Sequence, residues 1–131
     1  MLFTMEVVEE KKKAVLSLLE KYEKNMAATT EEDQNTKYKN AFSSLRKSMA
    51  SALADYVFAE MCVVYIQDPE VEKQLRISAA MIVKENIHPL FDEMKTNGVG
   101  GFEETEKKID KLRETFLDSY YFPMWRKTAV A

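Results

Sequence analysis

Residues that interrupt helices are rare in this chain and lie at only a few places. Its 131 residues include three glycines and three prolines. They are found within the segment 98–101 and at Pro69, Pro89 and Pro123. Because glycine and proline disfavour the interior of a helix more than other residues do, the long stretches between these positions predict long helices. We therefore expect an all-α fold in which residues 1–131 form a single-domain, antiparallel bundle of four to six main helices.

The first long stretch carries apolar residues at helical spacing. Between Thr4 and Ala28 the apolar positions that share one face of a helix are Val8, Val15, Leu18, Leu19, Tyr22 and Met26. Lysines and glutamates fill most positions between them. After a short polar connection, the segment Thr29-Thr30-Glu31-Glu32-Asp33 combines an N-cap threonine with an acidic residue three positions later, so it is suited to start a new helix. We assign residues 1–36 to an N-terminal helix and its connection.

The most apolar stretch of the chain is residues 57–66, which is interrupted only by Glu60. A helical stripe leads into it without any glycine or proline, and its members are Tyr38, Phe42, Leu45, Met49, Leu53 and Tyr56. A helix that is apolar all round belongs at the centre of a fold. We expect residues 57–66 to form the core, with helices 69–88 and 102–122 packed on it.

Local signals predict where the later helices begin and end. Asp68-Pro69-Glu70 predicts a start, because aspartate caps free amides, proline suits the first helical position and glutamate favours the positive end. Pro89 is expected to kink this helix or to end it near His88. The segment 97–101 predicts a loop, since glycine tolerates a positive φ. In the last helix the inward positions are Phe102, Thr105, Ile109, Leu112, Phe116 and Tyr120.

Composition and charge argue against several classes of function. The chain has 19 basic and 22 acidic residues, a formal net charge of −3, so we expect no nucleic-acid partner. The apolar run 57–66 is too short to cross a bilayer, and the N-terminus lacks the basic start of a secretory signal. We expect a cytoplasmic protein with no transmembrane segment.

The residue types that usually carry catalysis or bind metals are scarce. Glu85 and His88 have the spacing of half a di-iron carboxylate site, but the second pair is missing because His88 is the only histidine. The single cysteine, Cys62, lies in the apolar stretch, so we expect a buried thiol and neither a disulfide nor a zinc site. The glycines of 98–101 are followed by Phe-Glu-Glu rather than by the Lys-Ser/Thr of a phosphate loop. We expect no catalytic residues, no metal and no cofactor, and hence a protein that is not an enzyme.

A series of spacings in the second half of the chain resembles a known helical family. The segment from Phe58 through Cys62 to Tyr65 is similar to Phe-Trp-x-x-Cys-x-x-Tyr, with alanine in place of the tryptophan. Ala79, Ile82 and Ile87 are similar to Ala-x-x-Ile-Tyr-x-x-x-Ile, with valine in place of the tyrosine. Three further segments follow the same order, namely Phe42 to Leu45, Phe102 to Ile109, and Leu117 to Tyr120. Residues 37–126 therefore resemble the regulator-of-G-protein-signalling (RGS) homology domain, although only fourteen residues separate Ile87 from Phe102, about half of the usual interval.

The resemblance implies a domain that binds a protein, with the α subunit of a G protein (Gα) as the candidate partner. RGS domains speed GTP hydrolysis by holding the switch regions of Gα. The positions that match their contact loops are Asp55, Asn97, Asp118 and Ser119, which would line one end of the bundle. The usual Glu-Asn pair before the central helix is Ala54-Asp55 here, so GTPase activation is expected to be weakened or absent.

Three other interpretations remain open at this stage. Asp55 and Asp118 could simply be solvated acids at helix ends, with Ser119 an ordinary helix residue. The chain could be a structural bundle or a homo-oligomer that buries the apolar face of residues 4–28. It could also bind a small ligand through its methionines and aromatic residues.

Overall fold

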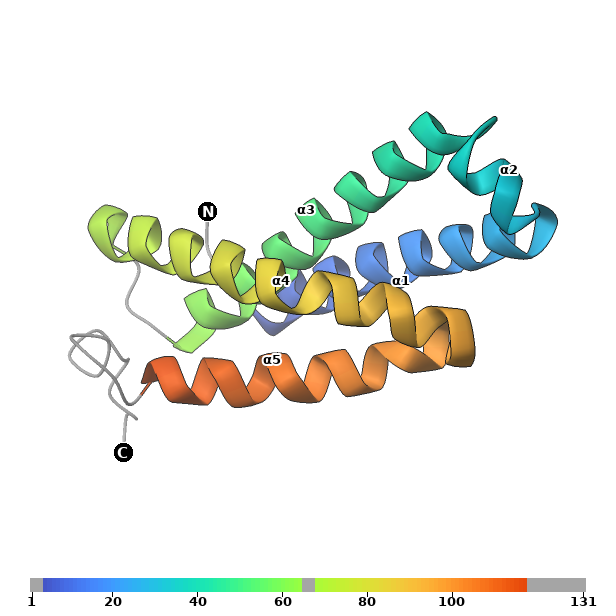
Figure 1. Ribbon diagram of the computed structural model, residues 1–131. Coiled ribbons are helices and arrows are strands. Elements are labelled where there is room, and N and C mark those ends of the chain that lie inside the picture. Colours follow the sequence, from blue (N-terminus) through green and yellow to red (C-terminus); the bar gives the residue numbers. More distant parts are fainter. Residues whose placement is uncertain (1–3, 65–67, 118–131) are drawn as a thin grey trace.

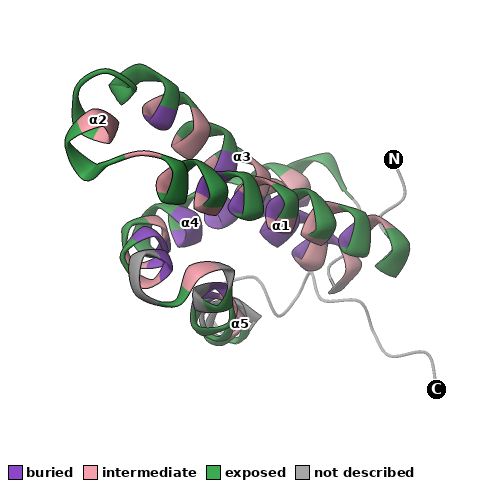
Figure 2. Cartoon of the chain, turned by 90° about the vertical axis from the view of Figure 1, so that its right-hand side faces the viewer, coloured by how far each residue is buried: buried purple, intermediate pink, exposed green. Residues whose placement is uncertain are grey.

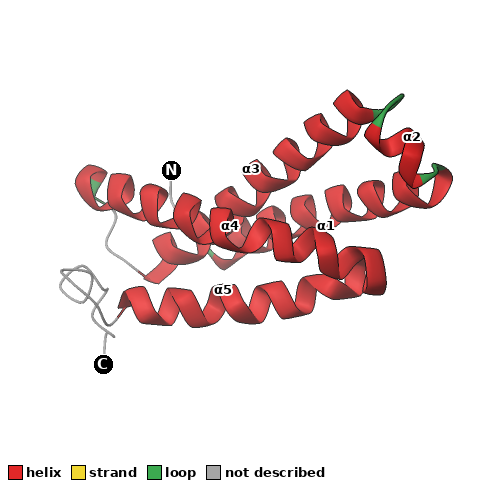
Figure 3. Ribbon diagram, viewed as in Figure 1, coloured by secondary structure: helices red, strands yellow, loops and turns green. Residues whose placement is uncertain are grey.

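The computed structural model describes residues 4–64 and 68–117, and every regular element in these ranges is helical (Figure 1, Figure 3). The α-helices are α1 (Met5–Ala28), α2 (Glu31–Asn35), α3 (Lys39–Val64), α4 (Pro69–Asn97) and α5 (Phe102–Leu117), with a short 3-10 helix, η1 (Gly98–Gly101), between the last two. The four long helices alternate in direction (Figure 1). The prediction of an all-α helical bundle is confirmed.

Each long helix packs against the long helix that follows it in the sequence. Helix α1 packs on α3, α3 on α4, and α4 on α5. Helices α1 and α3 diverge toward the end at which the short helix α2 joins them (Figure 1). This end of the bundle is therefore open. It is formed by the last turns of α1, the first turns of α3 and the second half of α4.

The predicted helix starts are confirmed by hydrogen bonds to the capping residues. The Oγ1 atom of Thr4 accepts from the amide of Val7 at 3.4 Å, and the Oγ1 atom of Thr30 accepts from the amide of Asp33 at 3.1 Å. The Oδ1 atom of Asp68 accepts from the amide of Glu70 at 3.0 Å. Each cap uses a donor two or three residues away, which is why these starts can be read from short motifs.

The core lies between α1, α3 and α4, where the buried residues face one another (Figure 2). On α1 the buried residues are Val8, Val15, Leu19 and Tyr22, as the spacing predicts. On α3 the buried residues include Val57, Phe58, Ala59, Met61 and Cys62, which together cover more than half of the circumference of the helix. The prediction that this segment lies at the centre is confirmed as far as Val63, because Tyr65 and Ile66 lie outside the described residues.

The expectation that Pro89 could end its helix is wrong, since α4 continues to Asn97. Three residues after the proline are buried, namely Leu90, Phe91 and Met94. A proline inside a helix costs about 3 kcal/mol. Burying three large apolar side chains contributes about 1.5–3 kcal/mol for each, so burial outweighs the lost hydrogen bond.

Three smaller expectations also need correction. Helix α5 packs mainly on α4 and η1 rather than on α3. Tyr38 precedes α3 and is exposed, although its spacing places it on the inward stripe. The glycine segment is a turn of 3-10 helix rather than an irregular loop, and Gly98 has the expected positive φ, 59°. Leu112 and Phe116 belong to α5, but their side chains, like all of Tyr120, fall outside the described part.

None of the helices in the described ranges combines the length and the apolar composition needed to cross a membrane.

Candidate functional site

The four residues expected to bind a partner do not form one described site. Asp55 lies on α3, with its Oδ1 atom 3.9 Å from Nη1 of Arg76 on α4. Asn97 is the last residue of α4 and donates a hydrogen bond to Oε2 of Glu93 at 3.1 Å. Asn97 follows Arg76 by about 20 residues on the same helix, which corresponds to about 30 Å along its axis. Asp118 and Ser119 lie outside the described residues.

The residues that carry the RGS resemblance are mostly core residues. Phe58, Cys62, Ala79 and Ile82 are all buried where α3 and α4 meet, and Ile87 is half-buried. The prediction of a buried thiol at Cys62 is confirmed. On the surface above them, the guanidinium of Arg76 lies 4.0 Å from the centre of the Phe58 ring. The spacings therefore describe how α3 and α4 pack.

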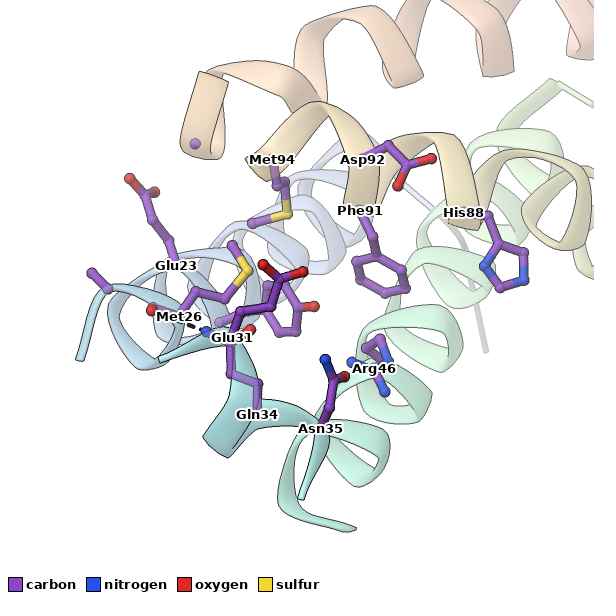
Figure 4. Close-up of a pocket in the computed structure, with 13 residues that line it drawn as sticks. Glu23, Met26, Glu31, Gln34, Asn35, Arg46, His88, Phe91, Asp92 and Met94 are labelled. Carbon is purple, nitrogen blue, oxygen red and sulfur yellow. Dashed lines mark hydrogen bonds between the residues drawn. The ribbon is translucent and has the colours of Figure 1, made fainter. Parts of the chain in front are cut away.

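A cavity of about 640 Å³ lies at the open end of the bundle (Figure 4). It is lined by residues of α1, α2, α3 and α4 and by Gly98. The apolar part of its lining consists mainly of Tyr22, Met26, Phe91 and Met94. The polar part includes Glu31, Gln34 and Asn35 from α2, Arg46 from α3, and His88 and Asp92 from α4.

The aromatic residues of the cavity are held in place by contacts with each other. The Tyr22 and Phe91 ring centres are 5.3 Å apart, and the Tyr22 ring also meets the edge of Phe42 at 5.8 Å. Such pairs contribute about 0.5–1.5 kcal/mol beyond the area that they bury. Tyr22, Phe91 and Met94 are themselves buried. The cavity thus has an ordered apolar surface on one side.

The short helix α2 forms another side of the cavity, although none of its residues is buried. It is attached to α1 by Gln34, whose Nε2 atom donates to the carbonyl oxygens of Met26 and Thr29, both at 3.2 Å. Met26 lines the cavity as well. The position of this wall therefore depends in part on one amide side chain.

The charged residues of the cavity differ in exposure. Arg46 is half-buried, whereas Glu31, His88 and Asp92 are exposed. None of these four forms an ion pair within the described parts of the chain. Glu23, which also lines the cavity, lies against the turn at Gly98. A Cβ atom added at Gly98 would be 2.6 Å from the Oε1 atom of Glu23.

A separate polar cluster joins three helices away from the cavity. The Nζ atom of Lys12 on α1 lies 3.1 Å from Oε2 of Glu106 on α5, and the hydroxyl of Tyr56 on α3 donates to the same oxygen at 3.3 Å. The hydrogen bond to Glu106 raises the pKa of Lys12, against the opposing effect of its burial. Burial raises the pKa of Tyr56, and the charges of Glu60 and Glu106 raise it further. This arrangement suits a structural contact better than a catalytic one, because the phenol is held in its protonated form.

Among the described residues, no group of three or more histidine, cysteine, aspartate or glutamate side chains is arranged to hold a metal ion. His88, considered from the sequence as half of a metal pair, lies at the cavity instead.

The cavity itself was not predicted from the sequence. Tyr22, Met26, Phe91 and Met94 all occupy apolar helical positions, which reveal burial but do not reveal that two helices diverge. Arg46 is one of 19 basic residues, and nothing in its neighbours sets it apart.

Comparisons of the chain with protein-family models, with curated proteins and with solved structures find no match.

Proposed function

We propose that this chain is a non-enzymatic helical domain that binds a protein partner at the open end of the bundle. The observation that supports this proposal is the cavity between α1, α2, α3 and α4, which combines ordered aromatic rings with charged residues. Its volume, about 640 Å³, is large enough for a large side chain of a partner together with part of the adjoining chain. An apolar centre surrounded by polar residues is also the usual arrangement of a protein interface.

The exposure of the lining residues favours a protein over a small ligand. Ala27, Glu31, Asn35, His88 and Asp92 all line the cavity and are all exposed. Small-ligand sites usually bury about 70–90% of the surface of the ligand. A small molecule in this open cavity would remain in contact with water. A protein partner would cover the surrounding residues with its own surface.

A variant that blocks the cavity without disturbing the core tests this proposal. Ala27→Arg places a long side chain at the opening, whereas Ala14→Arg makes the same change at an exposed position of α1 that does not line the cavity. Affinity capture with quantitative mass spectrometry would compare the partners of both variants with those of the unmodified chain. Partners lost only with Ala27→Arg support the proposal. Capture of the same partners by Ala27→Arg at full strength contradicts it.

A Gα subunit is the specific partner that the sequence resemblance suggests. GTPase activation by this domain is proposed to be weakened or absent, because Ala54-Asp55 replaces the usual pair and because Asn97 lies about 30 Å along α4 from Arg76, the residue that pairs with Asp55. Binding to the transition-state-mimic form of each Gα class, with single-turnover GTP hydrolysis, tests this identity. Absence of binding to every class removes Gα as the partner and leaves the cavity proposal in place.

The homo-oligomer alternative would need a surface other than the one first considered. The apolar face of α1, with Val8, Val15, Leu19 and Tyr22, is packed against α3 within the chain. Sedimentation equilibrium tests whether the chain associates through another face.

A further inference from the structure

We infer that the cavity recognises a segment of the partner in which an acidic side chain lies next to a large apolar side chain. This inference rests on the proposed function, because it assigns the chemistry of the group that enters the same cavity. Two observations carry it: an arrangement of unpaired donors lining the cavity, and the aromatic surface beside them.

Three side chains with hydrogen-bond donors line the cavity from three different helices, and two of them, Asn35 and Arg46, lie near each other in Figure 4. They are Asn35 on α2, Arg46 on α3 and His88 on α4. None of the three forms a hydrogen bond or an ion pair with the rest of the described chain. A carboxylate can accept from each of these side chains, since it has two acceptor oxygens and no donor of its own.

Arg46 is the residue expected to contribute most. A guanidinium presents two parallel N–H groups that match the two oxygens of a carboxylate, and such paired bonds are shorter and stronger than neutral ones. Arg46 is half-buried, whereas its neighbour Lys47 is exposed and does not line the cavity. A charge that is partly shielded from water interacts more strongly with an approaching opposite charge.

The apolar surface lies next to these donors. The ring of Phe91 points into the cavity between Arg46 and Met94, as Figure 4 shows, and Tyr22 packs against that ring. A guest that places its carboxylate on Arg46 therefore has its neighbouring side chain close to Phe91. An aromatic or long aliphatic side chain of the guest suits this surface, because the methionine and aromatic side chains of the cavity pack well against either kind.

Three carboxylates line the cavity and oppose an acidic guest, namely Glu23, Glu31 and Asp92. Glu31 extends over the cavity from α2, and Asp92 points away from the ring of Phe91 (Figure 4). Glu31 is the nearer source of repulsion to a guest carboxylate, so removal of its charge should strengthen binding. The acidic guest is favoured over a basic one because Arg46 is less exposed than Glu31 and Asp92, while Glu23, half-buried like Arg46, already interacts with another part of the chain.

The test uses capped dipeptides that differ in one charge. N-acetylphenylalanylglutamate amide is compared with its glutamine isostere, and N-acetylalanylglutamate amide measures the contribution of the aromatic ring. His88 is the only histidine, so its imidazole signals in the NMR spectrum report binding at the cavity without ambiguity. We expect the glutamate dipeptide to bind about tenfold more tightly than the glutamine dipeptide at low salt, with a smaller difference at high salt. The alanine dipeptide should bind more weakly than the phenylalanine one.

Matched variants assign the effect to Arg46. Arg46→Gln should abolish the preference for glutamate, whereas Lys47→Gln, which removes the same charge one residue away, should preserve it. Glu31→Gln should increase the affinity for the glutamate dipeptide. Circular dichroism establishes that each variant is folded before its binding is measured.

The outcomes separate this inference from the proposed function. Equal binding of the glutamate and glutamine dipeptides, or no shift of the His88 signals with any dipeptide, overturns the inference. A preference that survives in Arg46→Gln also overturns it. N-acetylphenylalanine presents the carboxylate of a chain end. If this compound binds and the glutamate dipeptide does not, the inference that the guest is an internal acidic segment is wrong. If partners are lost with Ala27→Arg but retained with Arg46→Gln, the inference fails while the proposed function stands.

Discussion

Gly98 is the residue whose backbone conformation most restricts what can replace it. Its φ of 59° lies in the left-handed region, where residues with a Cβ atom are strained. The residue also joins α4 to η1 and lines the cavity. A Cβ atom at this position would lie 2.6 Å from Oε1 of Glu23. The glycine therefore allows both the tight turn and the close approach of α1.

Gly98→Ala should lower the free energy of unfolding by about 1–2 kcal/mol, mainly through the unfavourable φ. The end of the Glu23 side chain can move aside, so its contribution should be the smaller one. Gly100→Ala is the control, since no atom lies within 4 Å of the added Cβ there. Urea unfolding followed by circular dichroism measures both. Equal stability of the two variants would show that the left-handed turn carries no such cost.

At the scale of single residues, the sequence predicts features that depend on near neighbours. The caps at Thr4, Thr30 and Asp68 are of this kind, because donor and acceptor are two or three positions apart. The roles of Arg46 and Asn35 were not predictable. Each is a polar residue on a helix, and what distinguishes it is the approach of two other helices.

Among the helices, α2 has the weakest attachment to the rest of the bundle. It buries none of its residues, and Gln34 supplies two hydrogen bonds from its side chain to the end of α1. Helices of this length are not stable alone, because the cost of nucleation is spread over few hydrogen bonds. The conformation of α2 therefore depends on this amide and on the Thr30 cap.

Gln34→Ala should increase hydrogen exchange of the α2 amides, with a loss in global stability of about 1 kcal/mol or less. Asn35→Ala is the matched control, because Asn35 carries the same amide group and forms no hydrogen bond within the described chain. Hydrogen exchange measured by mass spectrometry gives the local effect. Unchanged exchange in Gln34→Ala would mean that other contacts hold α2.

The predictions for whole helices succeeded where burial and local signals agree. Both ends of α1 and the starts of α2 and α4 were predicted, as was the burial of the apolar residues within 57–62. The prediction at Pro89 was wrong because the sequence shows the local cost of a proline inside a helix but not the burial that offsets it. The burial of Leu90, Phe91 and Met94 depends on the packing of the second half of α4. The angle between α1 and α3, which creates the cavity, is a tertiary property without a local signal.

For the whole molecule, the cluster of Lys12, Tyr56 and Glu106 is the polar contact that couples α1, α3 and α5. The folded state raises the pKa of Lys12 above 10.5 and the pKa of Tyr56 above 10.0. A raised pKa means that the folded state holds the proton more tightly than the unfolded state does. The stabilisation is therefore complete below these ordinary values and is lost as the pH rises through the raised ones.

We accordingly expect the free energy of unfolding to fall as the pH rises above 10. Tyr56→Phe removes the phenol, so the fall should be shallower in this variant, at the cost of about 1 kcal/mol near pH 7 for the lost hydrogen bond. Tyr38→Phe serves as the control, because Tyr38 is exposed. Urea unfolding between about pH 8 and pH 11 gives the three curves. Parallel curves for the unmodified chain and Tyr56→Phe would exclude Tyr56 as a source.

The order in which the helices pack also has a kinetic consequence. Each long helix meets the next long helix along the chain, so the contacts that define the bundle close only short loops. Closing short loops costs little chain entropy, and proteins dominated by such contacts cross their folding barrier within milliseconds or less. The hairpin of α1 and α3 is complete by Val64. During synthesis the two helices can therefore begin to pair outside the ribosome while α4 is still inside it.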